Sequence, residues 1–412
     1  MPGRSIDLAT AENWLIRSDL LELLRENFWN HLELKHLSYA GGLGGPPELL
    51  AALAKFYNCF FEPSNPVEPD HLVVGPGSSS IIDTLINDIC DDGDGLLVAA
   101  PMWGSFEISA VLRNSVRIIP VQVPFREVES AQGVVSAYRI AAQKATCNIR
   151  GILFCNPHNP SGHISRPEVT DALLQYCEEE DLHFISDEVY ALSTFGAFEG
   201  AADKHGKIFR SSATNFVSVL QKHLQGLGVN PSRVHQVYSF SKDFGSSGVR
   251  LGCLVTQANK GLRMSQAILN NAKMCNFAAV VFTPFLNDLP KLRTLVHINK
   301  YRLREAAQIA VQFAEFHGQD YFMPAAGLYI WIRLLSGCTN WNEEEQVIQR
   351  CAEHGVSIGG GADYAELCPG WFRLTFAVSQ TDFLIGIQRI EEALGYKTKF
   401  HEYVSAKTGV GL

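Results

Sequence analysis

Residues 238–252 read YSFSKDFGSSGVRLG, a stretch that sets one lysine among serines and glycines and places an arginine eight residues after it. The stretch overlaps an apolar run at residues 234–240 (VHQVYSF) and leads into another at residues 250–255 (RLGCLV). Short apolar runs bounded by glycine and serine are typical of buried strands. Lys242 is therefore expected at the end of a strand, next to several groups that can hold an anion.

Apolar runs of the same kind recur along the chain, and amphipathic segments separate several of them. The runs lie at residues 71–75, 95–100, 116–123, 150–157 and 182–188, and the helical patterns include residues 79–90 and 166–182. This alternation predicts an α/β fold in which a large domain has a mostly parallel sheet.

The pattern of apolar and charged residues changes after about residue 285. Residues 291–317 form one long charged helical pattern, and the short strand-like runs GLYIWIRL and GWFRLTF follow it. This change indicates a smaller α+β domain. We predict a large cofactor-binding domain at residues 40–285, and a small domain made of residues 286–412 together with the N-terminal segment, residues 1–39.

Bulk composition excludes several classes of protein. The 412 residues are 46% hydrophobic and 19% charged, which supplies a buried core and argues against disorder. A net charge of −9 argues against a nucleic-acid or anionic-membrane surface, so a small molecule is the expected partner. The N-terminus lacks the pattern of a secretory signal and no apolar run approaches the length of a membrane span, so we expect a soluble, cytoplasmic protein.

Two further features carry less information. Ten cysteines are scattered without CxxC pairs, so most are expected to be reduced and packed as small apolar residues, and no metal site is predicted. Residues 195–222 are polar and contain glycine, and they are interpreted as a loop or an insertion.

Polar groups follow the predicted strands, at the ends where open α/β sheets bind ligands. In residues 75–85 (GPGSSSIIDTL) a glycine-rich turn runs into a helix, and its free amides with the hydroxyls of Ser78 and Ser79 can hold an anion. A tight turn with a serine N-cap explains this stretch about as well. In residues 100–106 (APMWGSF) Trp103 can stack on a flat ligand or simply pack against its neighbours.

Two more strand ends carry candidate residues. Residues 155–163 (CNPHNPSGH) hold Asn159 between prolines that fix the loop, and a plain turn is the competing interpretation. Residues 185–192 (ISDEVYAL) deliver Asp187 and Tyr190, although a lone aspartate at such a place commonly caps a helix.

Together these groups match the requirements of pyridoxal 5'-phosphate. Its phosphate needs an anion cradle, its ring needs a stacking partner, and its aldehyde needs a lysine amine for a Schiff base. A carboxylate beside the pyridine nitrogen keeps that nitrogen protonated, so that the ring can absorb the electrons of a substrate carbanion, and Asp187 suits that place. Tyr238 and Lys242 also make the Y-x-x-x-K spacing of a short-chain dehydrogenase, but no nucleotide-binding glycine motif lies near residue 1.

Five motifs give the chain a family resemblance: NPHNPSG, SDEVYAL and SFSKDFGSSGVRLG in that order, with TAENWL before them and PGWFR after them. The chain resembles the fold-type I pyridoxal-phosphate enzymes of the class I and II aminotransferase group. Within that group it is most similar to the 1-aminocyclopropane-1-carboxylate (ACC) synthases and to fungal ACC synthase-like proteins. The resemblance runs from residue 8 to the motif that begins at residue 369, and it implies an aspartate aminotransferase-like fold and a homodimer with shared active sites.

By position, the resemblance implies a role for each candidate residue. Lys242 would form the imine and remove the substrate α-proton, and Asp187 would pair with the ring nitrogen. Arg373 would clamp the substrate α-carboxylate in a two-pronged pairing, with Glu12 and Ala11 also near the substrate. The remaining cofactor contacts would come from Ser78, Ser79, Ser239 and Arg250 at the phosphate, Trp103 at the ring face, and Asn159 and Tyr190 at the phenolic oxygen.

The chain also departs from the plant synthases. Tyr39, in LSYAGGLGG, best matches a catalytic tyrosine that the family contributes across the dimer interface, but the glycine spacing after it is longer. GSSG replaces their GLPG after the lysine. These departures leave the cofactor site intact, and they mean that S-adenosylmethionine cannot be assumed as the substrate.

Three functions remain open at this point. The first is an ACC synthase-like lyase that deprotonates Cα and expels a group from Cβ or Cγ, for example by breaking a C–S bond. Fungal relatives in secondary metabolism would use a lyase of this kind. The second is an aminotransferase that releases a keto acid. The third is a cofactor-sensing transcription factor, which would need a basic DNA-binding domain before residue 1. Glu12 and PGWFR favour the lyase.

Overall fold

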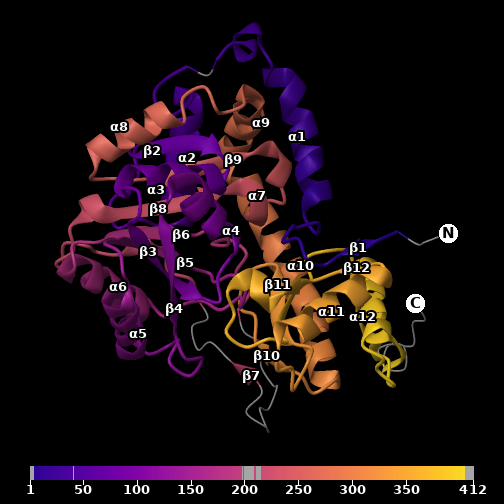
Figure 1. Ribbon diagram of the computed structural model, residues 1–412. Helices are drawn as coiled ribbons and strands as arrows, with labels where there is room; N and C mark the ends of the chain where they lie inside the picture. The colour runs from indigo at the N-terminus through magenta and orange to yellow at the C-terminus, as the bar shows by residue number, and fades with distance from the viewer. Residues whose placement is uncertain (1–3, 40, 197, 199–207, 210–214, 404–412) are drawn as a thin grey trace.

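The computed structural model describes residues 4–39, 41–196, 198, 208–209 and 215–403. In Figure 1 a large sheet with its helices occupies the upper left, and a smaller sheet with its helices lies below it on the right. Within the described residues no helix is long and apolar enough to cross a membrane.

The large sheet has seven strands in the order β2-β9-β8-β6-β5-β3-β4. Only β9 runs antiparallel to its neighbours, β2 and β8, and the other pairings are parallel. The strands are β2 (Leu72–Pro76), β3 (Gly95–Ala100), β4 (Arg117–Gln122), β5 (Ile149–Cys155), β6 (His183–Asp187), β8 (Val234–Ser239) and β9 (Leu251–Val255). The predicted α/β fold with a mostly parallel sheet is confirmed.

Helices cover both faces of this sheet, which is why most of its strands read as continuous apolar runs rather than alternating ones. One face packs under α3 (Ser78–Ile89) and α8 (Lys260–Leu269). The opposite face packs under α2 (Pro47–Phe60), α5 (Ala131–Lys144) and α6 (Pro167–Glu179). A ligand can therefore reach the backbone at the ends of the strands, and not across the covered faces of the sheet.

The second sheet has five strands in the order β13-β14-β11-β10-β7. They are β7 (Ile208–Phe209), β10 (Asp320–Phe322), β11 (Tyr329–Arg333), β13 (Gly359–Gly360) and β14 (Phe372–Thr375). β7 lies inside residues 195–222, so this segment contributes a strand and is more than the expected loop or insertion. Its neighbouring residues 199–207 and 210–214 lie outside the described part of the chain.

Three helices build a separate core against the small sheet, namely α10 (Leu289–Phe316), α11 (Trp341–Glu353) and α12 (Gln380–Ala393). The N-terminus joins this part of the molecule, because β1 (Ile6–Asp7) pairs in parallel with β12 (Val356–Ser357). α1 (Arg17–His31) then crosses to pack on α9 (Asn276–Asn287). The domain boundaries near residues 39 and 285 stay a prediction.

Candidate active site

The strands β2, β3, β5, β6 and β8 run in the same direction, so their carboxyl ends meet at one edge of the large sheet (Figure 1). The candidate residues of these strand ends lie at that edge: Ser78 follows β2, Trp103 follows β3, Asn159 follows β5, Asp187 ends β6, and Ser239 ends β8. Arg250 also lies there, because β9 is antiparallel and begins where β8 ends.

A glycine cradle forms where β2 runs into α3. Gly77 has φ +87°, and a Cβ built on it would lie 2.3 Å from Nη2 of Arg250. A Cβ on Gly252 would lie 2.4 Å from the Gly77 carbonyl carbon. Only glycine fits either position, and the close approach exposes the first amides of α3, at Ser78 and Ser79, to an anion.

Arg250 presents its guanidinium to this cradle. Its Nη2 donates to the Pro76 carbonyl at 3.0 Å and its Nη1 donates to the Ser247 carbonyl at 2.8 Å. The residue itself sits in the left-handed region, at φ +60°. These bonds fix a positive charge beside the N-terminus of α3, where the helix dipole also favours an anion.

Ser239 caps α7 (Phe240–Asp243), the short helix that carries the lysine. Its hydroxyl accepts from the Ser241 amide at 3.2 Å, bonds the Leu251 carbonyl at 3.1 Å, and lies 2.8 Å from the Ser241 hydroxyl. Sequence reasoning missed Ser241, although its place directly before Lys242 in the quoted motif was a usable signal. The two buried serines form one hydroxyl cluster next to the lysine.

Lys242 is largely buried, and its amine donates to the Ala11 carbonyl at 2.7 Å. Burial, together with the charges of Arg373 and Arg250, lowers the pKa of Lys242 to about 8, against the opposing carboxylates of Glu12 and Asp187. A lysine with this pKa exchanges its proton close to neutral pH, as a group that takes a proton from a substrate must.

Asp187 is buried at the end of β6, and within the described residues its side chain has one hydrogen bond, from the Val189 amide to Oδ1 at 3.4 Å. Burial, with a smaller contribution from the neighbouring Glu188, raises the pKa of Asp187 to about 7, and the bond from the Val189 amide and the charge of Lys242 oppose the shift. The adjacent Glu188 is different, because its carboxylate accepts four hydrogen bonds, from Ser186, Ser218, the Val219 amide and Gln236. Asp187 is thus a buried acid with unused acceptor capacity.

Arg373 extends from β14 toward the Asn159 loop. Its Nη1 donates to the Asn159 side-chain oxygen at 3.0 Å and its Nη2 donates to the Ala9 carbonyl at 2.5 Å. Its Nε is buried and has no partner within the described residues. Because Asn159 uses its oxygen on Arg373, its NH2 group is the part left to donate to a ligand.

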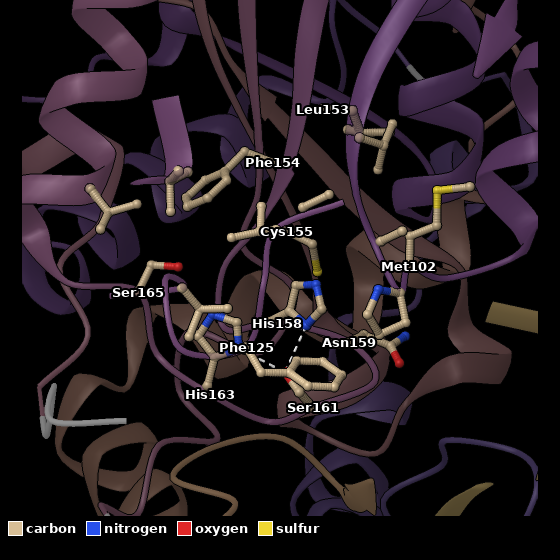
Figure 2. A pocket seen from close by; sticks show the side chains of 18 of the residues that line it. Met102, Phe125, Leu153, Phe154, Cys155, His158, Asn159, Ser161, His163 and Ser165 are labelled. Atoms are coloured by element: carbon tan, nitrogen blue, oxygen red, sulfur yellow. Dashed lines mark hydrogen bonds between the residues drawn. The ribbon is translucent and has the colours of Figure 1, made fainter. Parts of the chain in front are cut away.

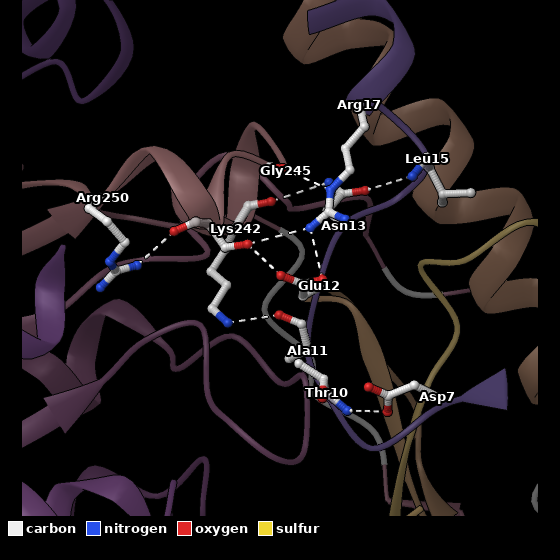
Figure 3. A network of polar contacts seen from close by, with 11 residues as sticks. Asp7, Thr10, Ala11, Glu12, Asn13, Leu15, Arg17, Lys242, Gly245 and Arg250 are labelled. Atoms are coloured by element: carbon white, nitrogen blue, oxygen red, sulfur yellow. Dashed lines mark hydrogen bonds and ion pairs between the residues drawn. The ribbon is translucent and has the colours of Figure 1, made fainter. Parts of the chain in front are cut away.

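Glu12 lies on the N-terminal segment, beside Ala11, whose carbonyl accepts from the Lys242 amine (Figure 3). Nη2 of Arg17 reaches its carboxylate at 2.9 Å, and the Ser247 hydroxyl donates to its Oε1. Burial alone would raise the pKa of Glu12, but the hydrogen bonds of Ser247 and Arg17 outweigh it and the pKa is lowered. Glu12 is therefore a fixed anion near Lys242, and Ser247, from the GSSG departure, is one of the groups that hold it.

Asn13 ties the same segment to the lysine helix. Its Nδ2 lies 2.8 Å from Oδ1 of Asn299 on α10 and 3.3 Å from the Lys242 carbonyl, and the Asn299 amide in turn donates to the Asp243 carbonyl at 3.1 Å. Figure 3 shows Ala11, Glu12 and Asn13 running directly past Lys242. The N-terminal segment forms one wall of the site.

Two predicted residues have no described contact with Lys242 or Asp187. Trp103 is half-buried and packs edge-on against Phe106, with ring centroids 5.3 Å apart. Tyr39 is 86% exposed and lines a surface hollow next to α9, with Asn276 and Thr283. The described contacts do not bring Tyr39 to Lys242 of the same chain.

A largely apolar cavity opens behind the Asn159 loop (Figure 2). The pairing of β3 with β5 extends only to Leu97 and Ile152, short of both strand ends, and Val98 and Leu153 from these strands line the cavity. His158 and His163 each place Nδ1 2.7 Å from the Ser161 hydroxyl. Burial lowers the pKa of both histidines, so they are neutral near pH 7 and brace the loop that carries Asn159.

The residues of this edge fit pyridoxal phosphate. The glycine cradle with Arg250 suits a phosphate, the underused carboxylate of Asp187 suits a protonated ring nitrogen, and the Lys242 amine suits an aldehyde. The unpaired Nε of Arg373 suits the carboxylate of an amino acid. The donors and acceptors present are those that this cofactor and an amino-acid substrate would use.

Comparison with known proteins agrees with this fit. The model of a family described as "Aminotransferase class I and II" matches residues 16–390. The "Aminotransferase verI" of Clonostachys rogersoniana is 55% identical over 408 residues, which is 98% of this chain and 90% of that protein. The "1-aminocyclopropane-1-carboxylate synthase 7" of Arabidopsis thaliana is 27% identical over 341 residues, which is 81% of this chain and 72% of that protein.

Solved structures share the fold. An aspartate aminotransferase from Thermus thermophilus, solved with maleate, has a TM-score of 0.76 at 21% identity, over 95% of this chain and 92% of that one. The resemblance that the motifs indicated and the fold that it implied are confirmed.

Proposed function

The chain belongs to the class I and II aminotransferase family, and we propose that it is a lyase of the ACC synthase-like kind, acting on an α-amino acid. It is an enzyme of the pyridoxal-phosphate-dependent aminotransferase class, as the sequence predicted. The proposal adds that it expels a group from Cβ or Cγ of its substrate, with C–S cleavage as the favoured case. The alternative is transamination to a keto acid.

Each residue at the strand ends has a proposed role. Arg250, Ser239 and the first turn of α3, with Ser78 and Ser79, would hold the cofactor phosphate. Trp103 would cover the ring, Asp187 would face its nitrogen, and Asn159 and Tyr190 would face its phenolic oxygen. When bound, the cofactor supplies an aldehyde that captures amines and a ring that accepts the electrons of a bond broken at Cα.

The protein's own groups would then act on the substrate. Arg373 would bind the α-carboxylate through its free N–H groups, and this orients the Cα–H bond. Lys242 would take the α-proton at its Nζ, for which a pKa of about 8 is suitable. The segment that carries Ala11 and Glu12 would keep water away from the lysine.

The observation that favours a lyase is the Glu12 carboxylate, which Arg17 and Ser247 hold near Lys242. Its charge raises the pKa of Lys242 and so favours the ammonium that forms once the lysine has taken the α-proton. Transamination requires Lys242 to give that proton back to the cofactor, whereas elimination lets it stay until a leaving group has departed. A fixed anion near Lys242 therefore favours elimination over transamination.

The product test uses S-benzyl-L-cysteine with the holoenzyme, and alanine as a control without a leaving group. We expect benzyl thiol, pyruvate and ammonia in equal amounts, because elimination breaks the C–S bond and the remaining enamine hydrolyses. S-adenosylmethionine is the second probe, with release of methylthioadenosine as the readout. If both substrates keep their C–S bonds while the enzyme forms keto acid and the amine form of its cofactor, the enzyme is an aminotransferase.

We also propose a homodimer in which Tyr39 reaches the active site of the partner subunit. Exposed apolar side chains gather near Tyr39, on α1, on the short helix Leu34–Leu37 and on α9; they are Trp29, Leu34, Leu37 and Phe277. Such a group of exposed apolar residues favours an interface. Within its own subunit the tyrosine has no described contact with the lysine, which is consistent with action across a two-fold axis.

Mixing two inactive variants tests the shared site. Tyr39→Ala and Lys242→Ala subunits are each expected to be inactive alone, but a hybrid dimer would place both lesions in one site and leave the other intact. Random exchange makes half of the dimers hybrid, so we expect about a quarter of the wild-type activity. Verified subunit exchange without recovery of activity would place Tyr39 in its own subunit's site or outside both.

A further inference from the structure

Tyr364 lies beside Arg373, the residue that the proposed function assigns to the substrate carboxylate. It ends the turn Gly361–Tyr364, which lies between β13 and β14 in the chain, and its side chain is buried. The Cζ atom of Arg373 lies 4.9 Å from the centre of the Tyr364 ring, and it lies at the same distance from the ring of Tyr329. Trp331 packs edge-on against Tyr364, with ring centroids 5.3 Å apart and an interplanar angle of 67°. The Tyr364 ring is thus fixed against the guanidinium.

The backbone of the same turn meets the segment that carries Trp103. The Tyr364 carbonyl accepts from the Met102 amide at 2.7 Å. A Cβ built on Gly104 would lie 2.2 Å from the Asp363 carbonyl oxygen, so the two backbones approach too closely for any side chain. Gly104 has φ −60°, a value that other residues also adopt, so this contact and not backbone strain requires the glycine. Trp103 is therefore held on both sides by the turn of Tyr364.

Glu344, on α11, holds this turn in place. Its buried carboxylate accepts from the Ala362 amide at 3.0 Å and from the Gly370 amide at 2.7 Å. These two amides lie on either side of Tyr364 in the sequence. Because the turn is held before and after Tyr364, we expect a displacement of the Asp363 carbonyl to move the Tyr364 ring as well.

We propose that Tyr364 is a positioning residue for the substrate carboxylate, and that its turn links Arg373 to the Trp103 segment of the cofactor site. The ring restrains the guanidinium by a cation–π contact, so Arg373 loses less side-chain entropy when it binds a carboxylate. The backbone of the turn sets the place of Trp103 through Met102 and Gly104. The inference rests on the proposed roles of Arg373 and Trp103.

The ring is tested by titrating the holoenzyme with propionate, which has a carboxylate but no amine, and following cofactor absorbance. Tyr364→Leu should weaken propionate binding by roughly three- to tenfold, the effect of one buried cation–π contact. Tyr364→Phe keeps the ring and should bind propionate as the wild type does. Without propionate, absorbance should be the same in all three proteins, because the Tyr364 carbonyl and its bond to Met102 remain.

Three results would overturn this part of the inference. They are unchanged binding by Tyr364→Leu, an equal loss in Tyr364→Phe, and altered absorbance of Tyr364→Leu without propionate. The last would mean that the side chain supports the cofactor site as a whole.

The link is tested from the other side by Gly104→Ala, since no described contact joins Gly104 to Arg373. The added Cβ displaces the Asp363 carbonyl, and the Tyr364 ring with it, so propionate binding should weaken by about threefold or more. Gly261→Ala, on α8, is the matched control. A Cβ there meets only the Asn259 side chain, at an ordinary 3.7 Å, and binding should stay at the wild-type level.

A double-mutant cycle shows whether Gly104 acts through the ring. In the Tyr364→Leu background, Gly104→Ala should cause no further loss of propionate binding. Wild-type binding by Gly104→Ala, or losses that multiply in the double variant, would refute the link. Arg373→Lys separates the two levels of the argument. If it binds propionate as the wild type does, the proposed role of Arg373 fails and the inference with it, whereas a loss in Arg373→Lys without one in Tyr364→Leu refutes the inference alone.

Discussion

Replacement of Lys242 by alanine is expected to give a protein that folds but holds no cofactor through a covalent bond. The purified wild type should be yellow, and after borohydride reduction it should keep the cofactor through denaturation. In Lys242→Ala that attachment should vanish, and turnover should fall on the order of 10⁴-fold, because the same amine is the proposed acceptor of the α-proton. Mass spectrometry of the reduced, denatured protein measures the attachment directly.

Two controls make this result specific. Lys242→Arg keeps the buried positive charge but offers no amine that can attack an aldehyde, so it should lose the attachment as the alanine variant does. Lys300 is the rival amine, since burial also lowers its pKa and it interacts with Asp243 next to Lys242. Lys300→Ala should keep the attachment. A reducible covalent cofactor in Lys242→Ala would move the assignment to another lysine.

The strands were predictable because both faces of the large sheet are covered. Residues 95–100 and 150–157 read as unbroken apolar runs, and they became β3 and β5 with small shifts at the ends. The candidate residues followed from the same logic, since Asp187 lies at the end of one such run and Lys242 comes two residues after another. Residues 195–222 gave no comparable run, which is why β7 was not expected.

The contacts inside the site were not predictable in the same way. Ser247 and Glu12 are 235 positions apart, and Arg373 and Asn159 are 214 apart. No local period of the sequence reports on pairs at that separation, because tertiary packing alone brings them together. Asn159 was expected at the cofactor's phenolic oxygen, and the structure shows that its own oxygen is already used by Arg373.

Asp187→Asn is expected to lower turnover by about 10³-fold while the cofactor remains bound. The amide keeps the shape of the side chain but cannot hold a proton on the ring nitrogen, so electrons from Cα are accepted less readily. The phosphate cradle and Lys242 are untouched, and absorbance should show a full complement of cofactor. Asp187→Glu keeps the charge and should recover part of the loss. Turnover at the wild-type rate in Asp187→Asn would remove this carboxylate from the mechanism.

The same substitution should make the cofactor-free protein more stable, not less. Burial raises the pKa of Asp187 to about 7 in the folded chain, well above its ordinary value of 3.8, so the folded state binds this proton more tightly than the unfolded state does. The unfolding free energy therefore falls as the pH rises between these two values, and an asparagine, which does not titrate, escapes that loss. Thermal unfolding of the apoprotein at pH 8 should show a gain on the order of 4 kcal/mol, which shrinks as the pH is lowered toward 5.

Glu188→Gln is the matched control for this gain. The Glu188 pKa is also raised to about 7 by burial, but its carboxylate accepts hydrogen bonds from Ser218, the Val219 amide and other groups, and an amide would leave some of these donors unpaired. That variant should destabilise the apoprotein, and cofactor should not restore its stability selectively. In the holoenzyme the wild type should instead be more stable than Asp187→Asn, because the Asp187 carboxylate pairs with the ring nitrogen and an asparagine does not. An apoprotein that Asp187→Asn destabilises at pH 8 would mean that the carboxylate is held by the fold itself, and not kept for a ligand.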